Sequence, residues 1–323
     1  MFTMCYQVSF KTEEGKTYNL NLLDAIEIER SVEKLVGTCK ITLPLYRFND
    51  PLFVQQDIKR GTEVTVCLGY DDQLNEEFRG YVTKIVYNNS SIIIECEDAL
   101  FLYRKSLKNE QFQDITLKEL LTHISNQIDP TYTIDCKYDL TYETFTINNK
   151  TGYDILKQIQ DTLAANVWFD TRNKILYVVL VYVDKLGDEK YSMHQNVEAS
   201  SLEYVRGADK KVEVIIEATD SNGTAKQVKV GESGGDQISL KIGNVKEKDI
   251  QELAEAIWKK KTSDRLNGTF TGWLIPMVMP GYTATIIDQE YPERTGPYYV
   301  ASVKTKFSAS GGVRTIEPGI KVG

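Results

Sequence analysis

The sequence predicts a β-rich α+β protein in which two similar antiparallel β-barrels flank an α+β insert. Three observations lead to this fold class. The first and last thirds of the chain carry short runs that alternate between apolar and polar residues, which is typical of half-buried strands. The middle carries two amphipathic segments that each begin with a helix-start signal. The two strand-rich parts also share a weak internal repeat, which indicates two related modules.

Length and composition restrict the class of protein. The chain has 323 residues, of which 41% are hydrophobic and 26% charged, so we expect a folded protein of two or three domains. No run is long and apolar enough for a membrane helix, and residues 1–6 lack the pattern of a signal peptide, so we expect a soluble protein. The net charge of −8 disfavours nucleic-acid binding. Five dispersed cysteines and only two histidines predict free thiols and argue against zinc sites.

The first segment, residues 1–105, is predicted to form a β-barrel. Its apolar and polar residues alternate, it is rich in β-branched and aromatic residues, and polar turn signals separate the runs, as in residues 14–16, 49–51, 71–72 and 88–91. Strands are expected at residues 18–22, 39–43, 64–68, 81–87 and 92–96.

The second segment, residues 106–200, is predicted to be an α+β insert. Thr116 and Glu119 form a capping box before an apolar helical face, and Asp129 with Pro130 ends that helix. Thr151 and Asp154 begin a second helix. A strand pair is expected at residues 132–135 and 145–147, followed by strands at 167–170 and 175–183.

The third segment, residues 201–323, is predicted to form a second β-barrel that carries one helix at residues 246–266. Asp249 and Glu252 form the helix-start signal, and the lysines at 259–261 favour the negative end of the helix dipole. Strands are expected at residues 202–205, 212–218, 227–230, 238–242, 269–273, 282–287, 298–307 and 313–317.

The internal repeat connects the first and third segments. Residues 61–66 (GTEVTV) match residues 281–286 (GYTATI), and residues 80–85 (GYVTKI) match residues 298–303 (YYVASV). In both copies a polar loop precedes the second strand, a turn follows it, and one more strand closes the unit. The alternative is that any two hairpins share such alternation by chance.

Motifs for enzymatic chemistry are weak. Residues 231–235 (GESGG) have the letters of a nucleophile elbow around Ser233, but the flanks are strand-like and no histidine follows, so we expect a hairpin loop. The same glycines lack the Gly-Lys-Ser/Thr of a phosphate loop. His123 could pair with Cys136 or Cys96 as a thiol catalyst, although a surface histidine is the commoner case, and His194 is expected in a loop.

The acidic, aromatic and basic clusters have ordinary structural explanations. The acidic group Asp71, Asp72, Asn75, Glu76 and Glu77 offers oxygen ligands for calcium but lacks the EF-hand spacing, so a solvated hairpin tip is favoured. No pair among the 46 acidic residues stands out as a glycosidase pair. Trp168, Trp258 and Trp273 are expected in a core or interface rather than a sugar cleft, and Lys259, Lys260 and Lys261 at a solvated helix end. We therefore assign no catalytic, cofactor-binding or metal-ligating residue.

The order of barrel, insert and barrel with one helix resembles that of the baseplate hub proteins of contractile phage tails. More closely, the chain resembles the XkdQ/YqbQ-type tail proteins of Gram-positive prophages and phage-tail-like bacteriocins, relatives of the late control protein D family. The resemblance covers essentially the whole chain and is carried by residues 151–156 (TGYDIL), 167–170 (VWFD), 174–178 (KILYV), 298–300 (YYV) and 313–319 (VRTIEPG). These are structural patterns, so the family contributes no functional residue to this sequence.

The resemblance implies a non-enzymatic structural protein without a cofactor. In such hubs the two barrels are similar to the tail-tube subunit, and three chains form a ring that adapts the sixfold tube to the threefold spike. Expected partners are the protein itself as a homotrimer, the tail tube protein, the central spike protein and other baseplate or tape-measure proteins, with neither a membrane nor specific nucleic acid. The expected location is the bacterial cytoplasm during assembly and then the phage tail or tailocin particle. An acidic channel wall would repel passing DNA.

Two other functions remain open at this point. A tail-associated peptidoglycan hydrolase is the main alternative, because some tail proteins carry enzymatic domains. An independent carbohydrate-binding β module is the third, and it requires an exposed aromatic face. Activity on peptidoglycan and binding to glycans distinguish these two alternatives.

Overall fold

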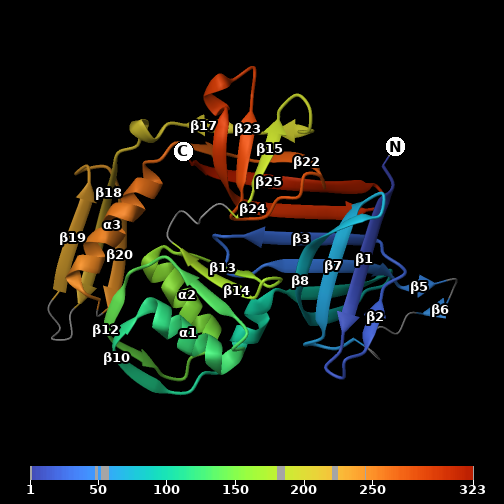
Figure 1. Ribbon diagram of the computed structural model, residues 1–323, viewed down its shortest axis with the longest axis horizontal. Helices are drawn as coiled ribbons and strands as arrows, with labels where there is room; N and C mark the ends of the chain where they lie inside the picture. Colours follow the sequence, from blue (N-terminus) through green and yellow to red (C-terminus); the bar gives the residue numbers. More distant parts are fainter. Residues whose placement is uncertain are drawn as a thin grey trace.

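The computed structural model describes residues 2–47, 50–51, 58–179, 186–219, 225–243 and 245–322. Figure 1 shows a large sheet beside a smaller part that contains the three α-helices. The strands of the first segment are β1 (Met4–Lys11), β2 (Thr17–Asn19), β3 (Ala25–Ser31), β4 (Thr38–Pro44), β5 (Tyr46–Arg47), β6 (Asp50–Pro51), β7 (Glu63–Tyr70), β8 (Gln73–Tyr87) and β9 (Ser91–Glu97). The expected turn at residues 49–51 lies partly outside the described residues, and Asp50 and Pro51 form β6.

The last part of the chain contributes the other half of the large sheet. Its strands are β15 (Asp188–Ser192), β16 (Ala199–Ser200), β17 (Glu203–Val205), β21 (Arg265–Asn267), β22 (Phe270–Trp273), β23 (Thr283–Ile287), β24 (Gly296–Ser308) and β25 (Gly311–Lys321). The main strand order is β16-β22-β25-β24-β3-β4-β9-β8-β7-β1-β2, with β15, β17, β21 and β23 attached to it. Because β24 pairs with β3, one sheet joins strands from both ends of the chain.

The predicted β-rich character is confirmed. No closed barrel is found in the part of the chain that the structure describes, so the arrangement as two barrels stays a prediction. Two separate apolar cores do lie within the sheet. One gathers side chains of the N-terminal strands, including Val8, Phe10, Ile41 and Val66, and the other gathers C-terminal side chains, including Phe270.

The helical part has its own core. Helices α1 (Leu117–Ile128), α2 (Gly152–Leu163) and α3 (Glu247–Lys261) contribute buried side chains to one cluster, together with the turn η2 (Ala99–Arg104). Both predicted capping boxes are present: the Thr116 hydroxyl accepts from the Glu119 N–H, and that of Thr151 accepts from the Asp154 N–H. The remaining short turns are η3 (Gly207–Asp209) and η4 (Pro292–Arg294). No described helix has the length and apolar character needed to cross a membrane.

Three small sheets complete this part. They are β10 (Glu110–Thr116) with β12 (Thr141–Ile147), β11 (Thr133–Cys136) with β14 (Ile175–Val179) and β13 (Asn166–Asp170), and β18 (Val212–Thr219) between β19 (Ala225–Gly231) and β20 (Asp236–Gly243). The expected pairing of strands 132–135 and 145–147 is wrong. The first pairs in parallel with β14, and the second pairs with β10, whose polar sequence gave no strand signal. Of the strand expected at 175–183, residues 180–183 lie outside the described part.

The third helix differs from its predicted bounds. It begins with Lys246 as N-cap, and the Asp249 carboxylate instead accepts from the backbone N–H of Thr141 at 2.8 Å. It ends at Lys261 rather than at 266, because the next residues pair as β21 with β17. Helix α3 packs on β18 and β19 and shares the core of α1 and α2. The predicted boundaries 1–105, 106–200 and 201–323 stay a prediction.

Candidate functional site: the repeated meanders and their shared strand contact

The predicted repeat contains two antiparallel meanders, β7-β8-β9 and β23-β24-β25. In the first meander, a glycine stands just before the first strand. Gly61 donates its N–H to the Val82 carbonyl at 2.8 Å, and Val82 donates back to the Thr62 carbonyl at 2.9 Å. Gly61 has a φ of +92°, a backbone conformation that favours glycine.

The second meander repeats these bonds. Gly281 donates to the Val300 carbonyl at 2.9 Å, Val300 donates to the Tyr282 carbonyl at 2.9 Å, and Gly281 has a φ of +89°. A β-bulge follows at the same place in both copies, after Val82 between β8 and β9 and after Val300 between β24 and β25. The second copy has one further register shift, between Tyr298 and Val300. Chance alternation does not account for the same bonds, the same backbone conformation and the same bulge together. The two segments are therefore structurally equivalent.

The equivalence extends to further strands in each copy of the meander. Beyond β9 lie β4 and then β3, and beyond β25 lie β22 with β21 and then β16 with β17. The registers agree when the two copies are aligned. Glu29 pairs with Thr38 in the first copy, and Glu203 pairs with Asn267, the counterpart of Thr38, in the second. Residues 25–31 thus correspond to residues 199–205. We call each set of equivalent strands a module.

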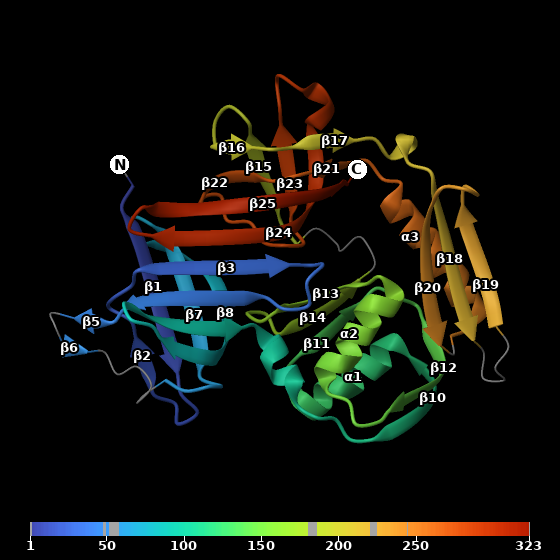
Figure 2. The same ribbon diagram turned by 180° about the vertical axis from the view of Figure 1, so that it is seen from behind.

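The two modules of the chain contact each other through one strand pair. The second half of β24, from Ser302 to Ser308, pairs antiparallel with β3. Figure 2 shows β24 and β3 side by side in the middle of the sheet. The Lys304 ammonium donates to the Glu29 carboxylate across this pair, which lowers the pKa of Glu29. Val32 adds a bond from its N–H to the Ala301 carbonyl at 3.0 Å.

A buried ion pair also joins the modules. The Arg314 side chain on β25 is fully buried, and that of Glu77 on β8 is 5% exposed. Arg314 donates to the Glu77 carboxylate and to the carbonyls of Leu274 at 2.9 Å and Pro276 at 2.6 Å. The Thr305 hydroxyl is 3.4 Å from the same carboxylate. A buried ion pair needs such additional hydrogen bonds to offset the loss of hydration.

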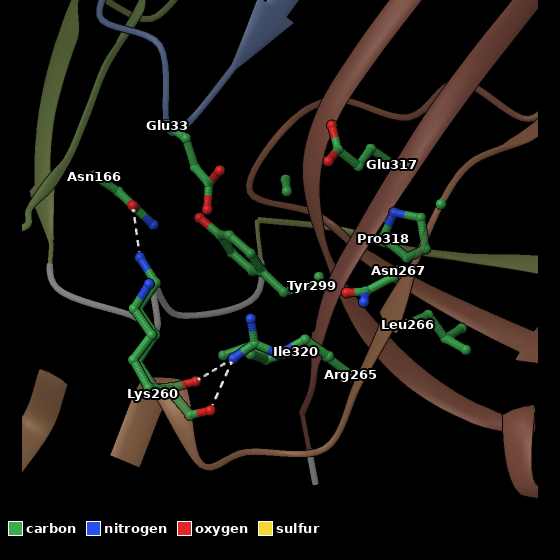
Figure 3. A pocket seen from close by; sticks show the side chains of 14 residues that line it. Glu33, Asn166, Lys260, Arg265, Leu266, Asn267, Tyr299, Glu317, Pro318 and Ile320 are labelled. Carbon is green, nitrogen blue, oxygen red and sulfur yellow. Dashed lines mark hydrogen bonds between the residues drawn. The ribbon is translucent and has the colours of Figure 1, made fainter. Parts of the chain in front are cut away.

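A polar cavity of about 310 Å³ lies where the large sheet meets the helical part. Figure 3 shows side chains from several elements around it. The Lys260 ammonium at the end of α3 donates to Asn166 Oδ1 at 3.1 Å. Arg265 donates to the carbonyls of Lys260 and Lys261 at 2.9 and 3.2 Å. These bonds connect the end of α3 to β13 and β21.

Burial dominates the electrostatics of this cavity. It lowers the pKa of Lys260, although the Glu33 carboxylate acts in the opposite direction. Burial also raises the pKa of the Tyr299 hydroxyl. The lining residues provide no serine or cysteine nucleophile. The cavity is therefore a polar contact between the helical part and the sheet, and its bonds hold the end of α3 in place.

The structure places the candidate catalytic residues in different elements. Ser233 lies in the turn between β19 and β20, with a strand rather than a helix after it. His123 contacts Glu110 at 2.7 Å and Gln127 at 2.8 Å, not a thiol. Burial raises the pKa of Cys136 to about 11 and raises that of Cys96 further, which opposes the thiolate needed by a nucleophile.

The acidic hairpin is divided among different partners. Asp71 and Asp72 form the turn with positive φ angles, and Asp71 accepts from the Thr3 N–H at 2.8 Å. Glu76 pairs with Arg79, while Glu77 points to the buried arginine already described. Asn75 lies on β8 among them. No group of metal-ligating side chains is found among the described residues.

The tryptophans and lysines have mixed outcomes. Trp168 stacks on Tyr177 and belongs to a small core between sheets, and Trp258 packs against the helical core, as expected. Trp273 lies outside the cores, because it is 51% exposed at the end of β22, where its indole donates to Glu198, so its place at an interface stays a prediction. Lys259 and Lys261 are exposed as predicted, but Lys260 turns into the cavity, and His194 lies in a turn.

Sequence reasoning missed the buried ion pair. Glu77 lies in the polar stretch 71–77, whose composition predicts a loop, and Arg314 lies near the start of a predicted strand. The signal appears only in the structure, where β8 continues without interruption from Gln73 and Glu77 takes an inward position that requires a partner.

Comparison with known proteins supports the fold. No protein-family model matches the sequence, and no curated protein matches it significantly. Among solved structures, a tail protein from Neisseria meningitidis is 13% identical with a TM-score of 0.68, covering 97% of this chain and 96% of that one. A 43 kDa tail protein of a Shewanella oneidensis prophage is 19% identical with a TM-score of 0.67, covering 98% of both chains.

A third similar structure comes from a secretion system. It is an E. coli component of the type VI secretion system, described as structurally similar to tail proteins of bacteriophage T4, with 10% identity and a TM-score of 0.63, covering 99% of this chain and 77% of that one. At such identities the similarity establishes the fold and leaves function to separate argument. The chain therefore has a fold shared by phage tail proteins and this secretion-system component.

Proposed function

We propose that this protein is a structural hub of a contractile phage tail or a phage-tail-like bacteriocin, in which three copies form a ring between the sixfold tube and the threefold spike. The observation that carries the proposal is the pair of equivalent modules within one chain, joined by β24 and β3. Three chains with two modules each present six similar units, which is the match required between sixfold and threefold partners. The similarity to phage tail proteins supports it.

One face of the sheet suits a channel wall. Charged side chains alternate in direct cross-strand pairs over five strands, β24, β3, β4, β9 and β8. The ladder runs Lys306, Glu27, Lys40, Glu95, Lys84. Opposite charges at facing positions stabilise the sheet and nearly cancel one another. We place this face toward the channel, where a nearly neutral polar surface lets cargo pass without trapping it, in place of the acidic wall expected from net charge.

The proposed partners follow from this role. They are two further copies of the chain, a tube protein, a central spike protein and neighbouring baseplate or tape-measure proteins. The protein would assemble in the bacterial cytoplasm and then belong to the particle, and the XkdQ/YqbQ-type resemblance is the finer assignment. We propose no enzymatic role, because the Cys136 thiol donates to the Tyr138 carbonyl and His123 contacts Gln127 and Glu110, so the two do not form a thiol–imidazole pair.

The test is the mass and symmetry of the purified chain. Native mass spectrometry should give three copies, and electron microscopy of the ring should show six similar units around a channel. A monomer at every concentration and in the presence of the tube protein would contradict the ring. Incubation with purified peptidoglycan tests the hydrolase alternative, which release of soluble fragments would favour.

A further inference from the structure

Each module has two strand edges that take part in contacts between modules. In the contact already present, the C-terminal module contributes the second half of β24, and the N-terminal module contributes β3. The equivalent of β24 in the N-terminal module is β8, and the equivalent of β3 in the C-terminal module is the segment 199–205, which contains β16 and β17. One chain therefore uses one edge of each module and has the other two left over.

The positions correspond residue by residue. The shared bulges after Val82 and Val300 make Lys84 the counterpart of Ser302, so residues 84–86 correspond to residues 302–304. Residues 203–205 correspond to residues 29–31. In the internal contact Val303 pairs with Arg30, and Lys304 pairs with Glu29. The leftover edges therefore have a defined register: Ile85 opposite Tyr204, and Val86 opposite Glu203.

Both leftover edges are open in the part of the chain that the structure describes. Strand β8 pairs with β9 on one side, and with β7 on the other side only up to Tyr81. Residues 84–86 thus have one edge without a strand partner. On the other side, β16 pairs only with β22, and β17 pairs only with β21. An open strand edge is a template for pairing with another chain.

We propose that residues 84–86 of one copy pair antiparallel with residues 203–205 of a second copy, repeating between chains the contact that β24 makes with β3 within a chain. This contact rests on the proposed function, for which it supplies the joint between subunits. The occupant of each edge is a second copy of this chain, because the internal contact already shows a module of this kind seated on the equivalent edge.

The side chains at the two edges fit this pairing. On the core-facing side, Ile85 packs at the margin of the N-terminal core, and Tyr204 packs at the margin of the C-terminal core. Pairing them would extend both cores, as aromatic and β-branched pairs do across strands. On the other face, Lys84 would lie diagonal to the exposed Glu203, which continues the alternating ladder of charges by one more step.

The symmetry type of the contact agrees with the proposed ring. A β8 edge meets a segment 199–205, so the contact is head-to-tail, and neither edge pairs with itself. Each contact between chains applies approximately the same rotation as the internal one, because the modules are equivalent. Alternating internal and external contacts then turn by equal steps, which close into the proposed ring of six modules when each step is about one sixth of a turn and otherwise extend as a filament.

Paired cysteines test the contact on the full chain. In the variant Ile85→Cys/Tyr204→Cys, the two thiols face each other across the proposed contact, within the reach of a disulfide between neighbouring strands. Val303→Cys/Arg30→Cys is the matched control, because it places cysteines at the equivalent positions of the internal contact. Each single variant controls for the native thiols. A second pair, Val86→Cys/Glu203→Cys, equivalent to the positions of Lys304 and Glu29, replaces the first if Tyr204→Cys does not fold.

The proposal expects covalent dimers and trimers on denaturing gels after oxidation of the double variants, and a closed disulfide without change of mass in the internal control. Single variants should give no trimers, and mixing them should give a covalent dimer. A native mass of three copies without cross-linking, while the internal control closes, overturns this contact but leaves the proposed ring intact. A monomeric mass without cross-linking at all concentrations, also with the tube protein added, overturns both.

Discussion

The ion pair between Glu77 and Arg314 gives the sharpest test of how the two modules are held together. Replacing Arg314 with Met removes the charge but keeps a long apolar side chain. The change leaves the Glu77 carboxylate buried without its partner, and it leaves two carbonyls without the donor that they now share. Breaking one side of a buried ion pair costs about 3–5 kcal/mol of unfolding free energy. We expect Arg314→Met to lose stability of that size.

A neighbouring pair on the same strand supplies the control. Arg79 donates to Glu76 in two bonds of 3.2 and 2.7 Å, with side chains 33% and 15% exposed. Solvent screens this pair, so Arg79→Met should cost only about 0.2–1 kcal/mol. The double variant Glu77→Gln/Arg314→Met removes both charges, and it should be more stable than Arg314→Met because no buried carboxylate stays unpaired.

Urea unfolding at neutral pH, followed by circular dichroism of the sheet, measures these differences. The chain has several cores, so the transition must first be shown to be a single step before free energies are compared. If Arg314→Met loses no more stability than Arg79→Met, burial does not determine how much the Glu77–Arg314 pair contributes to the unfolding free energy. The argument that it ties β8 to β25 then fails.

Three further predictions address single positions. Burial raises the pKa of Asp98 from 3.8 to about 7, against bonds from the N–H groups of Gly37 and Leu100, with Arg30 and Glu97 as nearby charges. The folded chain therefore holds this proton more tightly than the unfolded chain. The stability that the proton contributes is full below the unfolded pKa and is lost as the pH rises through about 7. Urea midpoints should fall across this pH range, and Asp98→Asn should make the midpoint depend less on pH. Gly61→Ala and Gly281→Ala should each cost about 1–2 kcal/mol because of their positive φ angles. At Gly281 the new Cβ would lie 2.9 Å from Leu186 Cδ1, which is the end of a flexible side chain and can move aside, so the two losses should be similar. Gly243→Ala, which has open space, is the control for both in thermal unfolding. Trp168→Ala should cost about 3–5 kcal/mol because Trp168 is 6% exposed between two sheets, whereas Trp273→Ala at a 51% exposed site should lower the melting temperature far less, and equal losses would contradict this assignment.

The sequence allowed prediction of the elements whose signals are local. The capping boxes at Thr116 and Thr151 placed both insert helices, because the bonds that begin a helix join residues three positions apart. The start of α3 was predicted to within one residue, but the Asp249 signal used for it belongs to a distant bond with Thr141 rather than to a cap. Strand pairing depends on contacts far apart in sequence, so the partners of β11 and β12 could not be inferred from alternation.

The candidate site shows the same limit. Repeated letters around Gly61 and Gly281 were visible because backbone geometry restricts those positions to glycine. The correspondence of β3 with residues 199–205 was not visible, since their side chains differ and only the register relates them. The contact of β24 with β3 joins positions at opposite ends of the chain, and the sequence of neither segment identifies the other as its partner.

The two kinds of contact between modules should also differ in strength. Glu77 corresponds to Thr295 in the second module, and Arg314 corresponds to Ile92 in the first, by the same alignment. The contact between copies would therefore lack the buried ion pair of the internal contact and its bonds to carbonyls. We expect moderate urea to separate the copies before the sheet unfolds, because the contact within the chain has a buried ion pair that the contact between chains lacks. Native mass measured alongside circular dichroism checks this order, and loss of both signals at one urea concentration would show that the internal pair gives no such difference.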